Sequence, residues 1–116
     1  MKMKHLLIAL TLIACFTQAQ SQVWQQIGQD IDGEEAGDLS GRSVSLSSDG
    51  NTIAIGAFLN DGNGNQSGHV RIYDWNGSVW LQKGEDIDGE APDDESGHSV
   101  SMSSDGNTVA IGAFGN

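Results

Sequence analysis

The chain opens with one continuous apolar run and then changes to short runs in which apolar and polar residues alternate. The continuous run covers residues 6–16 and is interrupted only by Thr11. Farther along, residues 43–47 alternate strictly, which places Val44 and Leu46 on one face of an extended strand. No later stretch has a convincing helical period. The pattern therefore predicts an all-β domain that is preceded by a short apolar helix.

Turn residues divide the alternating part into short strands. Within the first 56-residue unit we expect strands at 43–47, 52–58, 69–75 and 79–82, separated by Gly, Asn and Asp clusters. The second strand is apolar on both faces, which indicates burial on both sides, and its small residues would let a neighbouring sheet approach closely. Asn76-Gly77 predicts a type I′ hairpin between the last two strands.

The same pattern occurs twice, with a period of 56 residues. Residues 23–60 align with residues 79–116 without a gap, and 27 of the 38 aligned positions are identical. A fixed period near 50 residues is typical of repeat arrays and propellers, and four short strands are the content of one propeller blade. We therefore predict antiparallel four-stranded β-propeller blades, with a first repeat at 23–78 and a truncated second repeat at 79–116.

The N-terminal apolar run has the features of an export signal. It follows a basic start, and its eleven residues would rise only about 16 Å as a helix, too short to span a bilayer. We expect a signal peptide at 1–19 with cleavage after Ala19, and a secreted or cell-surface product. The alternative is a lipoprotein signal at 1–14, because Leu12–Cys15 resembles a lipobox. Cys15 would then be lipidated, in an outer-membrane lipoprotein.

Composition excludes several classes of partner. The 116 residues contain 16 acidic and 5 basic side chains, a formal net charge of −11. This balance argues against nucleic acids and anionic membrane surfaces as partners. Cleavage of the signal would remove Lys2, Lys4 and the single cysteine, leaving a more acidic chain with no internal disulfide and no transmembrane span. A small exported domain without disulfides depends on another source of stability, which we expect to be repetition.

Three short motifs carry a family resemblance. Gly41–Val44 and Gly97–Val100 match an F-G-x-S-V element, Ile53–Ala57 and Val109–Ala113 match L-x-V-G-A, and Gly68–Tyr73 matches G-x-V-Y-V-Y. The chain resembles FG-GAP repeats, the blade units of integrin-α-type propellers and of secreted bacterial surface proteins. The resemblance implies a seven-bladed propeller in an extracellular binding or adhesion protein.

The family often holds calcium in a D-x-[DN]-x-D-G-x-x-D loop. The matching turns here, Ser47–Thr52 and Ser103–Thr108, have one carboxylate each. Calcium requires six to eight oxygen ligands, so we expect that the family's calcium site is lost and that the protein has no cofactor.

Two acidic runs are the remaining candidates for a cation site. Neither fits the EF-hand pattern, so we expect solvated acidic loops, with a calcium site as the alternative. The candidate ligands in the two runs are Asp30, Asp32, Glu34 and Asp38, and Asp86, Asp88, Glu90 and Asp94.

Other chemistry-bearing residues do not form a recognisable catalytic pattern. His69 and His98 are expected to be strand-end or surface histidines, because zinc needs several converging ligands. No serine lies in a G-x-S-x-G elbow. We expect the tryptophans at 24, 75 and 80 to pack across adjacent strands rather than to form a stacking patch for a sugar. No catalytic residue is predicted, and the chain is expected not to be an enzyme.

These observations favour an exported binding or adhesion module that recognises an extracellular protein or glycan through loops at the blade ends. The alternatives are a structural scaffold unit and, less favoured, a fragment of a propeller-based hydrolase or lyase. Because residues 23–116 hold about 1.7 repeats, we expect further repeats or self-association to close a propeller.

Overall fold

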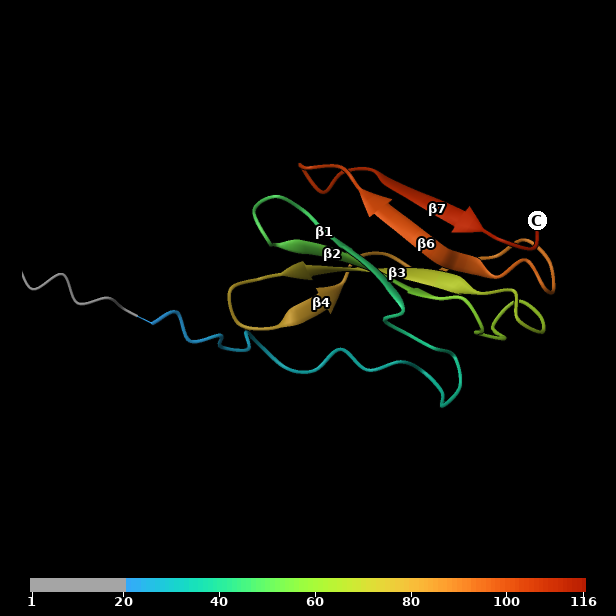
Figure 1. The fold of residues 1–116 in the computed structure, drawn as a ribbon, viewed down its shortest axis with the longest axis horizontal. Helices are drawn as coiled ribbons and strands as arrows, with labels where there is room; N and C mark the ends of the chain where they lie inside the picture. Colours follow the sequence, from blue (N-terminus) through green and yellow to red (C-terminus); the bar gives the residue numbers. More distant parts are fainter. Residues whose placement is uncertain (1–20) are drawn as a thin grey trace, which may run out of the picture.

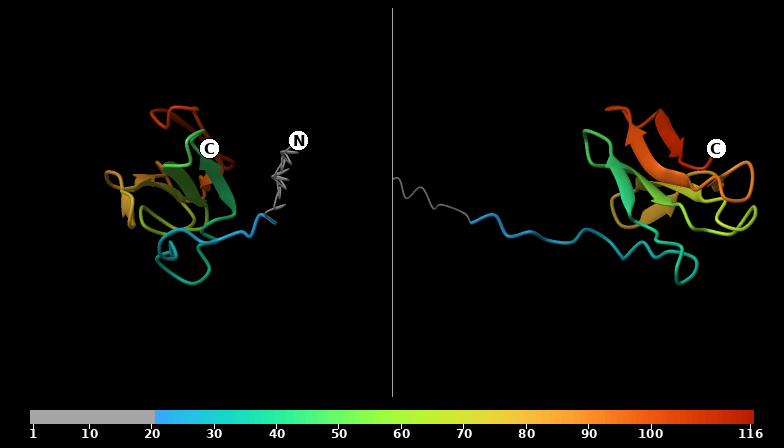
Figure 2. Two further views of the ribbon diagram at one scale, coloured as in Figure 1. Left: turned by 90° about the vertical axis from the view of Figure 1, so that its left-hand side faces the viewer. Right: turned by 45° about the vertical axis from the view of Figure 1, so that its right-hand side comes forward.

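The computed structural model describes residues 21–116, which fold into two antiparallel β-sheets packed face to face (Figure 1). The predicted signal peptide, with Ala19 and Cys15, lies outside the described residues. Within the described part there is no helix, and so none that could cross a membrane. The two sheets are not closed into a ring, so the fold is that of an incomplete β-propeller (Figure 2). The all-β prediction is confirmed.

The first sheet has five strands and the second has two. The first contains β1 (Ser43–Leu46), β2 (Thr52–Ala57), β3 (His69–Trp75) and β4 (Trp80–Gln82) in that order, with β5 (Ile87–Asp88) also paired to β3. The second contains β6 (Ser96–Met102) and β7 (Val109–Ala113). All these pairings are antiparallel, and no described strand pairs with the outer edge of β7.

The first sheet extends beyond the first sequence repeat. Strands β4 and β5 belong to the second repeat, yet Trp80 pairs with Trp75 and Ile87 pairs with Val70 of β3. The prediction that residues 87–88 lie in an acidic loop is wrong, because they form β5. After β4 the chain continues beside β3, and β5 pairs with the first two residues of that strand. The strand register therefore brings the acidic stretch around Asp86 next to the beginning of β3.

The corresponding segment of the first repeat, residues 24–32, forms no strand. Trp24 is 97% exposed, so the prediction that it packs across a strand is wrong, since it has no neighbouring strand. The prediction is confirmed for Trp75 and Trp80, whose rings lie 5.4 Å apart. The segment is nevertheless attached to β4, because the Gln29 side chain exchanges two hydrogen bonds with the backbone of Trp80.

Small residues allow the two sheets to approach closely, as the sequence predicted. The carbonyl oxygen of Gly97 in β6 lies against Gly56 in β2 and accepts a hydrogen bond from the Ser43 hydroxyl. Ser45 accepts a hydrogen bond from the backbone N–H of Met102. The core between the sheets is apolar, and it consists of Ala54, Val70 and Ile72 from the first sheet and Val100, Met102, Val109 and Ile111 from the second.

The 56-residue period also appears in the backbone. Five pairs of equivalent positions adopt left-handed φ angles, including the non-glycine pair Leu39 (54°) and Glu95 (53°). Since residues other than glycine rarely adopt this conformation, its recurrence shows that both repeats follow one path. The other pairs are Gly28 and Gly84, Gly37 and Asp93, Gly41 and Gly97, and Gly50 and Gly106.

The hairpin between β3 and β4 differs from the predicted type I′ turn. A type I′ turn needs positive φ at both central residues, and here Gly77 has this conformation while Asn76 does not. The loop instead has four residues, 76–79, between the paired Trp75 and Trp80. The Asn76 side chain accepts hydrogen bonds from the N–H groups of Ser78 and Val79, so an Asx turn replaces the tight hairpin.

Candidate functional site

An acidic hollow lies beside the beginning of β3, at one end of the first sheet. Its volume is about 480 Å³, and it opens to solvent between the segment before β1 and the loop after β2. It is lined by Glu34, Glu35, Asp38, Asn60, Asp61 and Gly62. Four of these six residues are acidic, so the hollow presents a concentrated negative charge.

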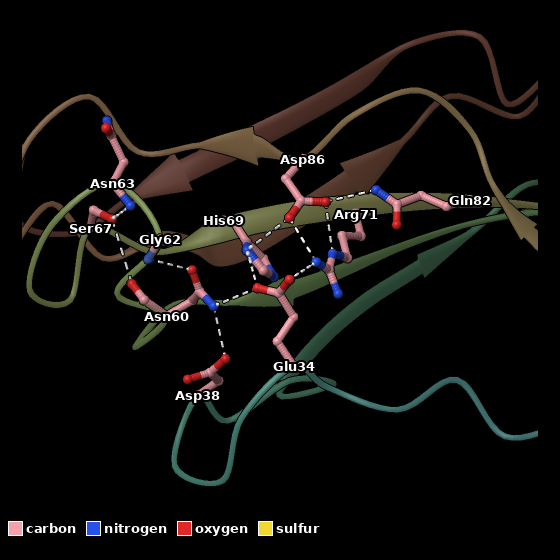
Figure 3. A network of polar contacts seen from close by, with 10 residues as sticks. All are labelled: Glu34, Asp38, Asn60, Gly62, Asn63, Ser67, His69, Arg71, Gln82 and Asp86. Atoms are coloured by element: carbon pink, nitrogen blue, oxygen red, sulfur yellow. Dashed lines mark hydrogen bonds and ion pairs between the residues drawn. The ribbon is translucent and has the colours of Figure 1, made fainter.

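A cluster of charged side chains lies beside this hollow and shares Glu34 with it (Figure 3). His69 and Arg71 are the first and third residues of β3, so their side chains project from the same face of the strand. Asp86 is the residue before β5, whose pairing with β3 brings it opposite this face. Glu34 comes from the segment that precedes β1. We call Glu34, His69, Arg71 and Asp86 the β3 cluster.

Arg71 links the two carboxylates of the β3 cluster. Its Nε and Nη2 atoms each donate a hydrogen bond of 2.7 Å to Asp86, and Nη2 also contacts Glu34. Gln82 donates a further hydrogen bond to Oδ1 of Asp86. These donors favour the ionised carboxylate, so the pKa of Asp86 lies below its ordinary value, chiefly because of Arg71. The same hydrogen bonding raises the pKa of Arg71 further.

Asn60 connects the β3 cluster to a third carboxylate. Its Nδ2 atom donates hydrogen bonds to Oε2 of Glu34 (3.1 Å) and to Oδ2 of the buried Asp38 (2.8 Å). Two carboxylates thus contact the Arg71 guanidinium, and a third, Asp38, is linked to them through Asn60. With His69 neutral, this group carries a net charge of −2.

His69 is buried and incompletely hydrogen bonded. Its residue surface is only 3% exposed, and Nδ1 has no hydrogen-bond partner among the described residues. Nδ1 faces Oδ2 of Asp86 at 3.7 Å and Oε2 of Glu34 at 3.9 Å, distances too long for hydrogen bonds. The prediction of a strand-end histidine is confirmed, but this side chain is not at the surface, because residues from both acidic runs cover it.

The structure brings together one residue from each acidic run, rather than the members of either run. Glu34 and Asp86 meet in the β3 cluster, and Asp38 joins them through Asn60. Asp30 accepts a hydrogen bond from Gln26, as Asp86 does from Gln82, but it lies in the exposed segment before β1. Asp94 is buried, and it accepts a hydrogen bond from the N–H of Ala91. The remaining members, Asp32, Asp88 and Glu90, are exposed.

The second repeat forms a smaller counterpart of the hollow. It is lined in part by Glu90, Asp94 and Asn116, which are equivalent to Glu34, Asp38 and Asn60. Among the described residues, the lining of this counterpart includes no histidine or arginine. A charge cluster of the β3 type therefore combines residues from two successive repeats.

The turns that match the family's calcium loop use their carboxylates internally. Asp49 accepts hydrogen bonds from the Ser47 hydroxyl (2.7 Å) and the Asn51 N–H (2.9 Å), and Asp105 repeats this arrangement with Ser103 and Asn107. The pKa of each aspartate carboxyl is lowered, chiefly because of the hydrogen bond from the serine hydroxyl. Each carboxylate thus stabilises its own turn.

His98 is engaged in aromatic packing. It lies in β6 between the rings of Phe58 and Phe114, with centroid distances of 5.0 and 5.4 Å. Among residues 21–116, neither His69 nor His98 is hydrogen bonded to a serine hydroxyl, so no nucleophile–base pair is formed there.

Residues 31–73 match the family model of the FG-GAP repeat. The matched stretch contains β1, β2 and most of β3, together with Glu34, His69 and Arg71 of the β3 cluster. No curated protein and no solved structure matches the chain significantly. The family match confirms the resemblance drawn from the sequence motifs. Repeats of this family typically form non-catalytic binding domains.

Proposed function

Since the chain is an FG-GAP-like repeat protein, we propose that it is a non-enzymatic binding or adhesion module, exported to the cell surface or the extracellular medium. The acidic hollow is the observation that carries this proposal. It is concave, open to solvent and lined by Glu34, Glu35, Asp38 and Asp61. Such a surface favours a partner that presents cationic groups, such as a lysine- or arginine-rich protein segment or an amino sugar.

We expect the purified chain to be retained on a surface that carries basic peptides and to be released by salt, because screening weakens interactions between exposed charges. Substituting Glu35→Gln together with Asp61→Asn should reduce retention about tenfold, since both residues line the hollow and lie outside the β3 cluster. Glu85→Gln together with Asp32→Asn removes two exposed charges that do not line the hollow, and this double variant serves as the matched control.

Retention can be measured on basic peptides, neutral peptides, glycans and whole cells. If the hollow variant and the control variant lose retention on basic peptides equally, the loss reflects net charge alone. That result would contradict a role for the hollow. A parallel measurement of retention in the presence of a chelator tests whether binding depends on a metal ion. No retention on any of these surfaces would contradict the binding module and favour the scaffold unit.

A second candidate, the scaffold unit, is favoured by the outer face of the first sheet. Val44 and Leu46 are 56% and 54% exposed there, on the side of β1 opposite to β6. Their equivalents in the second repeat, Val100 and Met102, pack against the first sheet. We propose that this outer face packs against the second sheet of another copy in the same way, head to tail. Head-to-tail contacts of this kind lead to rings or filaments.

Light scattering coupled to size exclusion tests this packing. The chain should show concentration-dependent oligomers, and Val44→Lys should shift it towards the monomer. Leu81→Lys, at an exposed apolar position on β4, should not cause this shift. A chain that is monomeric at all concentrations would contradict the scaffold unit.

A further inference from the structure

We propose that the β3 cluster is a binding site for a divalent transition-metal ion of the zinc type, with Glu34, His69 and Asp86 as ligands. This inference goes beyond the binding module and does not depend on it. The ligand set also differs from the calcium sites considered for the two acidic runs, because it takes one carboxylate from each run and an imidazole from β3.

The donor atoms already converge. One ligand atom from each of the three residues lies within 4.8 Å of the other two. Nδ1 of His69 is 3.7 Å from Oδ2 of Asp86 and 3.9 Å from Oε2 of Glu34. In a tetrahedral zinc site with bonds of 2.0–2.1 Å, ligand atoms are about 3.3–3.4 Å apart. Small side-chain rotations would therefore bring the three atoms to coordination distance.

The buried imidazole is the independent observation that points to a ligand. His69 is only 3% exposed, and among residues 21–116 its Nδ1 has no hydrogen-bond partner, although two carboxylate oxygens lie 3.7 and 3.9 Å away. A buried polar atom without a partner is unfavourable, and a metal ion between Nδ1 and the two oxygens would satisfy it. Neutral imidazole is also the commonest protein ligand for such metals.

Neighbouring side chains hold the two carboxylate ligands in place through hydrogen bonds. Asn60 donates to Oε2 of Glu34, and Gln82 donates to Oδ1 of Asp86. Arg71 donates to both oxygens of Asp86 and contacts Oε1 of Glu34, so a metal ion would share Oδ2 and Oε2 with Arg71 and Asn60. Such outer hydrogen bonds fix ligand orientation in metal sites. Arg71 repels a cation, but with Asp38 included the group has a net charge of −2, which a divalent ion would balance.

The chemistry of the donors selects the kind of metal. Calcium and magnesium prefer oxygen ligands, and calcium takes six to eight of them. One imidazole and two carboxylates suit zinc and related ions, with the remaining coordination position left to water or to a partner's side chain.

The test is zinc titration of the full chain by calorimetry, after metal has been removed with a chelator and the chelator dialysed away. We expect one zinc ion per chain, a higher melting temperature with zinc, and a visible absorption spectrum of low-coordinate Co²⁺ when cobalt is used. His69→Gln, Glu34→Gln and Asp86→Asn should each weaken zinc binding at least about 100-fold, because even outer-shell substitutions cost 10–100-fold.

The repeat supplies matched controls. Glu90 and Asp30 are the repeat equivalents of Glu34 and Asp86, but they do not belong to a cluster with a histidine. Glu90→Gln and Asp30→Asn should therefore leave the affinity for zinc unchanged. Glu34 is partly exposed, so Glu34→Gln should fold normally even if His69→Gln does not, and circular dichroism checks both. Absence of stoichiometric zinc binding would overturn the proposal. So would binding that survives Glu34→Gln, or binding that Glu90→Gln weakens equally.

Discussion

Gly56→Ala should unfold the chain at a much lower temperature than Gly112→Ala, although the two glycines are equivalent positions of the repeat. A Cβ atom at Gly56 would overlap the carbonyl oxygen of Gly97, a backbone atom of the opposite sheet. It could be accommodated only if the two sheets moved apart. Overpacking of this kind typically costs 1–3 kcal/mol, and we expect the upper end, about 3 kcal/mol, because the obstacle is backbone.

Gly112 is the matched control for this substitution. It lies in β7, and the nearest atom to its Cβ would be the hydroxyl of Ser99, a side chain that can rotate away. Gly112→Ala should therefore change stability by no more than about 0.5 kcal/mol. For a domain of this size the Gly56 variant should melt roughly 10–20 °C lower than the parent. Equal shifts for the two variants in thermal and urea unfolding would contradict the close packing of the sheets.

A chain extended by a copy of residues 61–88 after Asn116 should be more stable than the parent. The copied segment contains β3, β4 and β5, and its first strand should pair with the open edge of β7 as β3 pairs with β2. In the extended sheet the equivalents of Arg71 and Tyr73 would face the first sheet, because Val70 and Ile72 lie on the other face of β3. The gain would come from the hydrogen-bonded ladder along the open edge of β7 and from the contacts of these side chains, partly offset by the entropy of ordering the segment.

We expect a net gain of about 1–2 kcal/mol, or a melting temperature higher by about 5–10 °C, because the extension covers the open edge of the second sheet. The control is an extension of equal length and composition in which the copy of residues 69–75 is scrambled. The scrambled segment cannot reproduce the residue pairs that β3 forms with β2. If both extended chains melt at the parent's temperature, then β7 does not receive a third strand as β2 does.

Much of the architecture could be predicted because the signals are local and occur twice. The boundaries of β2 and β3 agree with the prediction to within one residue, since Ile53 and Ile55 on one face and Ala54 and Gly56 on the other mark a strand between two layers. The position of the sheet boundary could not be predicted, because a period of 56 residues gives the length of the unit but not where a sheet begins. Strands β4 and β5 therefore join the first sheet although they belong to the second repeat.

The same offset explains why the β3 cluster was missed. The sequence presents its carboxylates as two acidic runs of similar composition, and each run was considered as a site by itself. The cluster forms because the return along β3 brings Asp86 of the second repeat next to Glu34 of the first. A signal was nevertheless present: His69 and Arg71 are two apart on a predicted strand, so they share one face, and an arginine on a partly buried face needs a carboxylate nearby.

The central claim is that successive 56-residue repeats pack as neighbouring blades, with the apolar face of the second sheet against the first. Nuclear Overhauser cross-peaks between the sheets test it most directly. A Cβ atom at Gly97 would lie 3.0 Å from a methyl carbon of Val70, so the α protons of Gly97 must be close to that methyl group. We predict cross-peaks between these protons, and between the methyl groups of Val70 and those of Val100 or Ile111. A spectrum with cross-peaks within each sheet but none between the sheets would contradict this account.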